Sequence, residues 1–365
     1  MTDPVTHRSP LRLLPRVYAV RDEQGRPVIA SVKDALRQYA HSLNFVADRR
    51  RTLHALFEFS HWLMVIPTVI FFYRYASVET MLFFFAVFLV LANFTNTIWY
   101  HRYCSHRSFR FSSPWLPRLI LWLNPLGYRE EVYALVHNVH HLHADGDQDP
   151  NGPRLGWLGN YIASYFEVDT DVTEAEYERI KGRLSHLNMP FSSYQSFRRW
   201  ACVESIPHYL ARWIFASLLW AGAWYTIGGL PWLFAWLAVQ FCWHAVVRDF
   251  NFRGHGTQEN VRQVDGWDLD RSSFALNQRF YGYLAGEWHN NHHARPGSAN
   301  CAFLRGQFDI PFLLIRAMKT MRLVSSYNDH RAQFLAKFGR GVAQTEENDH
   351  KSDVGMRAER HESID

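Results

Sequence analysis

Long uncharged runs alternate with polar stretches along this chain. Met81–Tyr100 carries no charged residue over 20 positions, and Trp213–Val247 carries no Lys, Arg, Asp or Glu over 35 positions. One helix of 35 residues would measure roughly 52 Å, far more than the roughly 30 Å hydrocarbon core of a bilayer. Gly228-Gly229-Leu230-Pro231 lies in the middle of the longer run and favours a tight turn there. The longer run therefore predicts two helices.

The apolar runs predict four membrane spans, at about 56–74, 79–100, 211–229 and 231–249. The first span is the least apolar, because it contains Glu58, His61 and Pro67. Buried helices of a soluble protein are the alternative interpretation, but such helices seldom stay uncharged for about 18–20 residues. We therefore expect a multi-pass membrane protein.

Basic residues are distributed unevenly between the two sides that these spans define. The loop between the first two spans has Arg74 beside Glu79, and the loop between the last two has no charge. The opposite side receives Arg49, Arg50, Arg51, Arg102, Arg107, Arg110, Arg118, Arg198, Arg199 and Arg248. By the positive-inside rule, both termini and the long polar segments are expected to face the cytoplasm.

This pattern predicts an all-α fold in which about four transmembrane helices carry a cytosolic helical cap. Residues 1–52 form a polar cytosolic segment, and residues 53–325 form the membrane domain. Within that domain, 101–210 and 250–325 supply the cap. Residues 326–365 are polar and are expected to form a disordered tail.

Composition narrows the classes of function. The four cysteines form no Cys-x-x-Cys pair, which excludes a disulfide scaffold, a zinc ribbon and a cysteine-ligated iron–sulfur centre. The net charge of +5 is modest for 365 residues and gives no indication of nucleic acid binding. Histidine is the unusual residue, with 20 copies.

The histidines form three clusters, and the pattern His-x-x-His-His occurs twice. The clusters are His101-Arg-Tyr-Cys-Ser-His106, His137-Asn-Val-His140-His141 and His289-Asn-Asn-His292-His293. On a helix, positions i, i+3 and i+4 share a face, so each His-x-x-His-His box is expected to direct three imidazoles to one locus. His101 and His106 lie roughly 140° apart on an ideal helix. They converge only if that helix ends or distorts, or else they serve different metals.

A further candidate follows the fourth span, where Asn251 and His255 are also spaced i, i+4. Eight or nine histidines exceed the four ligands of a tetrahedral zinc site and suit a dimetal centre. Imidazole ligands alone leave iron, copper, zinc and nickel open. The spans place every cluster at one membrane face, which independently supports a shared site.

With these motifs in place, the chain resembles the integral-membrane fatty acid desaturase family over about 50–325. The resemblance rests on the order of the boxes, on Asn251-x-x-x-His255 and on the segments Gly286–His293, Pro296, Ser298-Ala299, His101–Phe109 and Gln307-Phe308-Asp309. These segments look most like those of the bacterial acyl desaturases, which implies a bacterial inner membrane. The family implies a di-iron centre of two Fe ions, with ligands at His101, His106, His137, His140, His141, His255, His289, His292 and His293 and with Asn251 acting through a water.

The resemblance also implies the reaction, which is desaturation of a fatty acyl chain with dioxygen and two external electrons. The chain has no dinucleotide, Cys-x-x-Cys or heme signature, so the donor would be separate, such as a ferredoxin or rubredoxin with its reductase. Relatives with similar boxes act as hydroxylases, acetylenases or oxidative decarboxylases that form terminal alkenes. Asn138 and Asn300 depart from the family pattern, so the substrate head, whether coenzyme A, lipid or free acid, stays open.

Outside enzymes, a histidine-rich membrane metal transporter is the alternative. A transporter predicts ionisable ligands near the bilayer midplane, whereas these clusters lie at span ends. Among the remaining candidates, His244 is better explained as a packed histidine than as a ligand. Asp145, Asp147, Asp149 and Glu287 are candidates for orienting ligand imidazoles, with plain loop or helix-surface acids as the alternative.

Overall fold

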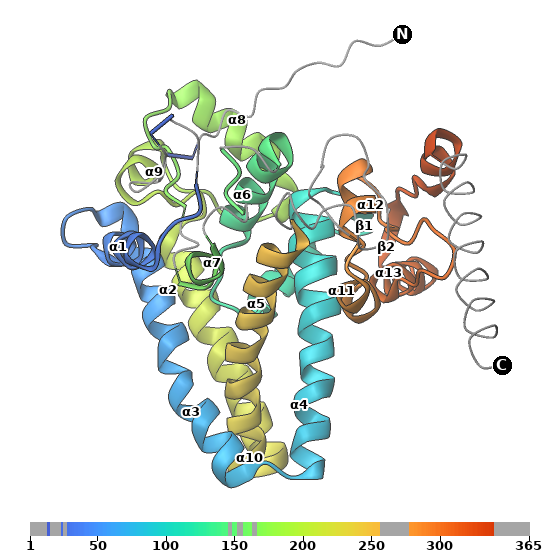
Figure 1. The fold of residues 1–365 in the computed structure, drawn as a ribbon, viewed down its shortest axis with the longest axis horizontal. Helices are drawn as coiled ribbons and strands as arrows, with labels where there is room; N and C mark the ends of the chain where they lie inside the picture. Colours follow the sequence, from blue (N-terminus) through green and yellow to red (C-terminus); the bar gives the residue numbers. More distant parts are fainter. Residues whose placement is uncertain are drawn as a thin grey trace, which may run out of the picture.

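The computed structural model describes residues 13–14, 23–24, 28–144, 148–151, 156–162, 166–255 and 277–338. The described chain is largely helical and forms a tall bundle topped by a wider cap (Figure 1). Its helices are α1 Val32–Leu43, η1 Arg49–Arg51, α2 Thr52–Leu63, α3 Val65–Ile70, η2 Phe71–Tyr75, α4 Val78–Val90, η3 Leu91–Ser105, α5 Trp115–Leu123, α6 Glu130–His143, α7 Gly156–Ile162, α8 Glu174–Leu184, η5 Ser185–Leu187, α9 Tyr194–Trp200, α10 Ile206–Gly254, α11 Arg279–Ala285, α12 His289–Ala294 and α13 Ile310–Thr320. The two strands are β1 Phe109–Phe111 and β2 Val324–Tyr327.

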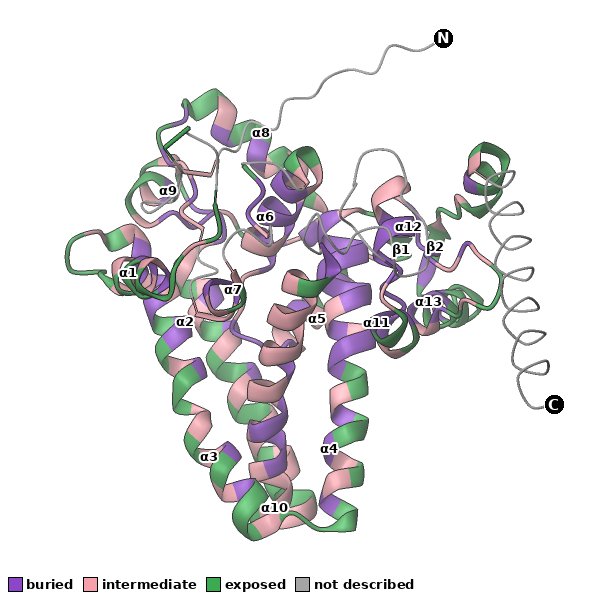
Figure 2. Cartoon of the chain, in the orientation of Figure 1, coloured by how far each residue is buried: buried purple, intermediate pink, exposed green. Residues whose placement is uncertain are grey.

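Three helices in the described chain are long and apolar enough to cross a membrane. They are Arg49–Tyr75, Val78–Ser105 and Ile206–Gly254. Their lower parts carry many exposed side chains, whereas buried residues gather where the upper ends of the long helices meet the cap (Figure 2). Leu82 is 67 % exposed and Leu218 is 69 % exposed, as expected for side chains that face lipid rather than water. The protein is therefore a membrane protein with an all-α architecture.

The third long helix, α10, corresponds to the last two predicted spans. Gly229 has φ 65° and ψ −155°, and Pro231 follows it, so the helix axis reverses at this point. The two arms then lie side by side, and Trp220 and Trp236 bring their ring centroids to 6.0 Å (Figure 1). The predicted turn is confirmed, although the helical segments extend beyond the predicted bounds at both ends.

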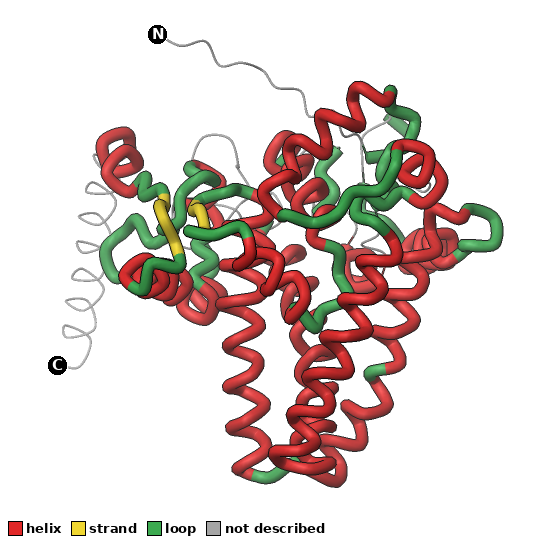
Figure 3. Tube along the Cα trace, turned by 180° about the vertical axis from the view of Figure 1, so that it is seen from behind, coloured by secondary structure: helices red, strands yellow, loops and turns green. Residues whose placement is uncertain are grey.

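The cap is built from the segments that join and follow the long helices. It holds the shorter helices and the two strands at one end of the bundle, as the view from behind shows (Figure 3). Buried ion pairs fasten these segments to the stalk. Arg212 of α10 donates to Glu130 of α6 at 2.6 Å and to Glu204 at 2.7 Å, and both carboxylates are fully buried. The helix that carries the second histidine box is thereby fixed at its N-terminal end.

The end of the described chain packs on the cap. Strand β2 pairs antiparallel with β1, so the predicted boundary between 325 and 326 falls inside a strand. Beyond it, Phe334 is fully buried against Phe303. Residues 326–338 therefore belong to the folded body rather than to a free tail, because paired strand and buried aromatic surface stabilise them. The rest of the predicted tail, from 339, lies outside the described residues.

Candidate metal centre

The nine predicted histidines come together in two adjacent groups. The five-histidine group contains His101, His106, His137, His141 and His292. The four-histidine group contains His140, His255, His289 and His293. Within each group the candidate ligand nitrogens lie within 4.8 Å of one another. Segments up to about two hundred positions apart in the chain thus converge at the top of the long helices.

The two boxes are divided between the groups rather than each being directed to one locus. In α6, His137 and His141 join the five-histidine group, whereas His140 joins the other. In α12 the assignment is reversed, since His289 and His293 join the four-histidine group and His292 joins the five. The expectation of one locus per box was wrong, because adjacent helical positions diverge by about 100° and can reach two sites.

A π-helix resolves the spacing of the first cluster. Residues Leu91–Ser105 form a π-helix, and the backbone N–H of His106 donates to the carbonyl of His101 at 3.2 Å. An i→i+5 hydrogen bond places residues five apart on the same side of the helix. The side chain of Ser105 repeats the spacing by donating to the carbonyl of Tyr100. His101 and His106 therefore reach the same group through the distortion that their spacing required.

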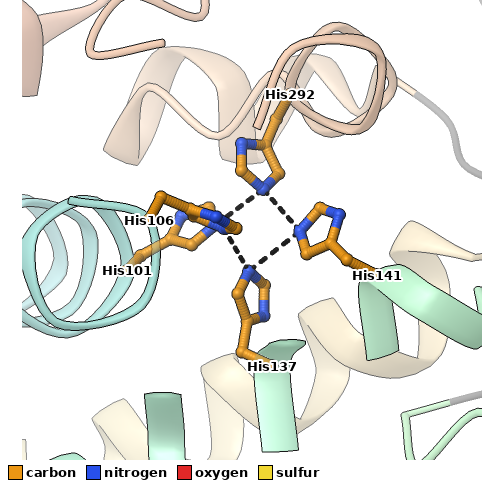
Figure 4. Close-up of side chains that lie close together, drawn as sticks. All are labelled: His101, His106, His137, His141 and His292. Carbon is orange, nitrogen blue, oxygen red and sulfur yellow. Dashed lines mark hydrogen bonds between the residues drawn. The ribbon is translucent and has the colours of Figure 1, made fainter. Parts of the chain in front are cut away.

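The five-histidine group is a ring of imidazole nitrogens at the meeting point of η3, α6 and α12 (Figure 4). The Nε2 atom of His292 lies 2.9 Å from that of His101 and 2.9 Å from that of His141. The Nε2 atom of His137 lies 2.8 Å from that of His106 and 3.1 Å from that of His141. All five rings thus present Nε2 to a common centre.

The four-histidine group combines α6 and α12 with the C-terminal end of α10. The Nε2 atoms of His289 and His255 are 2.6 Å apart, and those of His140 and His293 are 3.2 Å apart. Asn251, one turn before His255, lines the adjoining cavity. His255 and Asn251 both depend on where the second arm of α10 ends.

One imidazole in each group is backed by a carboxylate. In the five-histidine group, Nδ1 of His101 lies 3.0 Å from Glu287. In the four-histidine group, Nδ1 of His140 lies 2.7 Å from Asp149. Because a carboxylate accepts the Nδ1 proton, the Nε2 lone pair of both rings is directed into its group. Glu287 and Asp149 thus occupy the orienting positions considered from the sequence, and Asp145 and Asp147 lie outside the described residues.

The donor set suits metal ions. Burial, reinforced by neighbouring imidazoles, holds the pKa well below the ordinary histidine value for His106, His137, His141, His289, His292 and His293. These rings are therefore neutral at physiological pH, as metal ligation requires. A metal roughly 2.1 Å from each imidazole nitrogen separates neighbouring nitrogens by roughly 3.0–3.4 Å. Most of the Nε2–Nε2 separations within the two groups lie near that range, so the geometry fits a pair of metal ions.

A buried arginine between the first two histidines locks this arrangement, and sequence reasoning missed it. Arg102 donates to both carboxylate oxygens of Asp309, at 3.0 and 2.9 Å, and to the carbonyls of Ala299 and Gly286. Asp309 also accepts from the backbone N–H of Cys301. The pair joins η3 to the segments that flank α12. A charged residue inside an apolar helix, and an acid in the Gln307-Phe308-Asp309 segment, were the available signals.

A cavity adjoins both groups. Its wall includes His101 and His137 of one group and His140, His255 and His289 of the other. Apolar side chains from α2, α6 and α10 complete it, among them Phe57, Val136, Trp243, Val247 and Phe250. His244 also lines this cavity, where its Nδ1 donates to the carbonyl of Gln240. It joins neither group, in agreement with its interpretation as a packed histidine.

Comparison with known protein families identifies the family to which this chain belongs. The fatty acid desaturase family model matches residues 79–305, which is more than half of the chain. The chain belongs to the fatty acid desaturase family. That membership makes it an oxidoreductase of the desaturase type, and it confirms the resemblance drawn from the histidine boxes. The matched region contains all nine grouped histidines.

Individual relatives of this family member come from plants and cyanobacteria. The Delta-9 desaturase-like 4 protein of Arabidopsis thaliana is 28 % identical over 251 residues, which cover 66 % of this chain and 73 % of the relative. The sn-2 palmitoyl-lipid 9-desaturase of Nostoc sp. (strain 36) is 28 % identical over 236 residues, with 61 % and 73 % covered. The Delta-9 acyl-lipid desaturase 1 of Arabidopsis thaliana is 25 % identical over 232 residues, with 63 % and 69 % covered.

Proposed function

We propose that this protein is a membrane-bound di-iron desaturase that removes two hydrogens from a fatty acyl chain, with dioxygen and two external electrons as co-reactants. The observation that carries the proposal is the pair of histidine groups on the wall of a largely apolar cavity. A saturated C–H bond offers no acidic proton, so side chains alone cannot activate it. Two iron ions held by the nine histidines would supply that oxygen chemistry.

The protein's own residues bind and orient the chain beside the site. Phe57, Val136 and Val247 give the cavity an apolar wall that accepts methylene groups and excludes water. Glu287 and Asp149 fix the ring orientation of His101 and His140, both of which also line the cavity. Asn251 faces the same cavity, where its amide would reach the four-histidine group through a water.

The overall reaction needs partners. Each double bond formed takes one dioxygen, two electrons and two protons and releases two waters. No dinucleotide-binding, Cys-x-x-Cys or heme motif occurs in the sequence, so a separate carrier such as a ferredoxin or rubredoxin, with its reductase, would deliver the electrons. Two relatives carry lipid or acyl-lipid in their names, which favours a membrane lipid as substrate over coenzyme A or the free acid. The proposal also puts both termini and the metal site on the cytoplasmic side, which the positive-inside pattern supports. The membrane would be a bacterial inner membrane, as the likeness of the histidine boxes to those of bacterial acyl desaturases implies.

Metal analysis and product analysis together test the proposal. The purified wild-type protein is expected to hold near two irons per chain, and lipids from cells that express it should contain new monounsaturated acyl chains. His140→Ala should lose both iron and product. His143→Ala, on the exposed side of the same helix and outside both groups, is the matched control and should retain them.

The contrary results are distinct. Full desaturation by His140→Ala would refute the proposed site. Terminal alkenes in the headspace, or hydroxylated chains in the lipid extract, would show instead that the same site catalyses decarboxylation or hydroxylation.

A further inference from the structure

The metal centre has two sides, and only one faces the cavity. His101, His137, His140, His255 and His289 line the cavity wall. The remaining four grouped histidines do not line it, and three of these, His106, His141 and His293, are partly exposed at the surface of the cap. The substrate side and the outer side of the centre are therefore different surfaces.

Arginines gather on the outer side, beside His106. Arg107 and Arg110 are exposed, and Arg183 at the C-terminal end of α8 is half-exposed. The C-terminal turn of α8 is held against the end of η3, because the hydroxyl of Tyr103 donates to the carbonyl of His186 at 2.7 Å and Nε2 of His186 lies 3.1 Å from the carbonyl of Cys104. Arg183, three residues before His186, therefore lies on the same side of the cap as Arg107 and Arg110. Three like charges gathered there are an unfavourable arrangement for a surface without an acidic partner.

The acids nearby are engaged elsewhere. Glu178 pairs with Lys181 at 2.5 Å, and Asp171 lies 3.8 Å from Arg198. Within the part of the chain that the structure describes, no carboxylate pairs with Arg107, Arg110 or Arg183. Arg107 also has a backbone φ of 50°, an uncommon conformation that turns the chain directly after the ligand His106. Among the described residues, the cluster is therefore a positive patch without a carboxylate partner, beside the metal centre.

The composition of this patch argues for a protein partner rather than for lipid headgroups. Helix α8 and strand β1 both lie in the cap, away from the turn of α10 at the other end of the molecule (Figure 1). Leu142, which follows His141, is 56 % exposed and adds apolar surface beside the partly exposed imidazoles. Arginine combined with exposed apolar residues is the composition enriched in protein–protein interfaces.

We propose that Arg107, Arg110 and Arg183 form the docking surface for an acidic one-electron carrier protein, which delivers electrons to the metal centre at the edge of His106. The inference rests on the proposed function, because an oxygen-dependent desaturase needs this supply of electrons. Two reduced carriers would each lose one electron per double bond, and the two electrons would end, with two protons, in the waters formed from dioxygen. Such encounters are small, transient and steered by charge.

The test uses the full-length, iron-loaded protein in lipid nanodiscs. The probe is an acidic plant-type [2Fe–2S] ferredoxin, kept reduced by NADPH and its reductase, and the readout is the rate of monounsaturated product against ferredoxin concentration. Arg183→Glu should raise the KM for ferredoxin about tenfold at low salt with little change in kcat, and Arg110→Glu combined with Arg183→Glu should raise it about a hundredfold. Both differences should shrink as salt screens the charges.

Matched variants separate charge from folding. Arg183→Lys keeps the charge and should stay within about threefold of wild type, because steering depends on charge more than on side-chain geometry. Arg37→Glu reverses an exposed arginine on α1, away from the patch, and should leave the KM unchanged. A wild-type KM in the double charge-reversal variant, or a wild-type KM that does not respond to salt, would overturn the docking assignment.

A second measurement distinguishes failure of docking from failure of the proposed function. Each protein is reduced chemically without a carrier, freed of reductant and exposed to dioxygen for a single turnover. Equal product from wild type and Arg183→Glu, combined with the raised KM, supports the proposal. Product from wild type in this assay, but no oxidation of reduced ferredoxin, would reject an acidic carrier. No product from wild type would refute the desaturase function itself.

Discussion

The second and third histidine boxes have the same sequence pattern but divide their histidines between the two groups in opposite ways. The box on α6 gives its outer pair, His137 and His141, to the five-histidine group and its middle residue, His140, to the four-histidine group. The box on α12 gives its outer pair to the four-histidine group and its middle residue, His292, to the five. Each of the two helices therefore contributes histidines to both groups. A shift of either helix is expected to disturb both groups.

The two groups differ in what surrounds them. The histidines of the five-histidine group come from three helices, and Arg102 with Asp309 fastens η3 to the segments that flank α12. The four-histidine group takes His255 from the last turn of a long helix, directly before the stretch 256–276 that lies outside the described residues. The comparison shows that one group has an additional histidine and a buried ion pair beside it, whereas the other depends on where α10 ends.

Removing one ligand from each group is the strongest way to break this comparison. His289→Ala leaves three histidines in its group, whereas His292→Ala leaves four in the other. Both variants should lose product by more than the roughly 100-fold that loss of an outer partner costs. Iron content should differ, falling to near one per chain in His289→Ala and staying closer to two in His292→Ala. Equal iron loss in the two variants would show that the additional histidine has no effect on retention.

The contribution of the buried Arg102–Asp309 ion pair to the stability of the five-histidine group can be tested by removing one partner. Arg102 and Asp309 are 1 % and 2 % exposed at their side chains, so Asp309→Ala leaves an unpaired buried guanidinium. Removing one partner of such a pair costs about 3–5 kcal/mol. The thermal unfolding midpoint in detergent should fall sharply. Asp329→Asn, at an exposed acid in the same region, should leave the midpoint nearly unchanged, and a similar drop in both variants would argue against a specific anchor.

The carboxylates behind His101 and His140 should give smaller and site-specific effects. Glu287→Gln and Asp149→Asn keep the side-chain shape but remove the negative charge that accepts the Nδ1 proton. Each change is expected to weaken metal retention by about 10–100-fold. Chelator-driven iron release should then show one fast and one slow ion per chain in either variant. Uniform release of both ions would mean that each carboxylate does not act on its own group.

Much of this architecture could be predicted from the sequence because it depends on short-range patterns of residues. Uncharged runs predicted the long helices, and Gly229 and Pro231 predicted the turn in α10. The two repeated boxes, the first cluster and the Asn251-x-x-x-His255 motif together supplied the nine grouped histidines. Each of these signals depends only on neighbours within one or two helical turns. Spacing also showed that the helix carrying His101 and His106 had to distort or end if both served one site.

The remaining features depend on contacts that no local pattern records. The π-helix of Leu91–Ser105 is packed between other helices, and a period of 3.6 residues gives no indication of it. The division of each box between two groups follows from the facing helix, and Arg102 meets Asp309 across 207 positions. Strand β2 pairs with β1 across a similar separation, which is why residues beyond 325 were expected to be a tail. Tertiary packing decided each of these outcomes.

The smallest expected effect concerns the turn that sets where α10 ends. Gly229 has backbone angles that are accessible essentially only to glycine, so Gly229→Ala should cost about 1–3 kcal/mol. Because His255 lies at the far end of the same arm, strain at this turn should loosen the four-histidine group first. We expect a modest drop in the unfolding midpoint and faster release of one iron only. Gly222→Ala is the matched control, since a Cβ there meets nothing within 4 Å, and a helical alanine should be neutral or slightly stabilising. Loss of both ions at the same rate in Gly229→Ala would show that the two groups respond to the stalk as one unit, and would remove the difference between them.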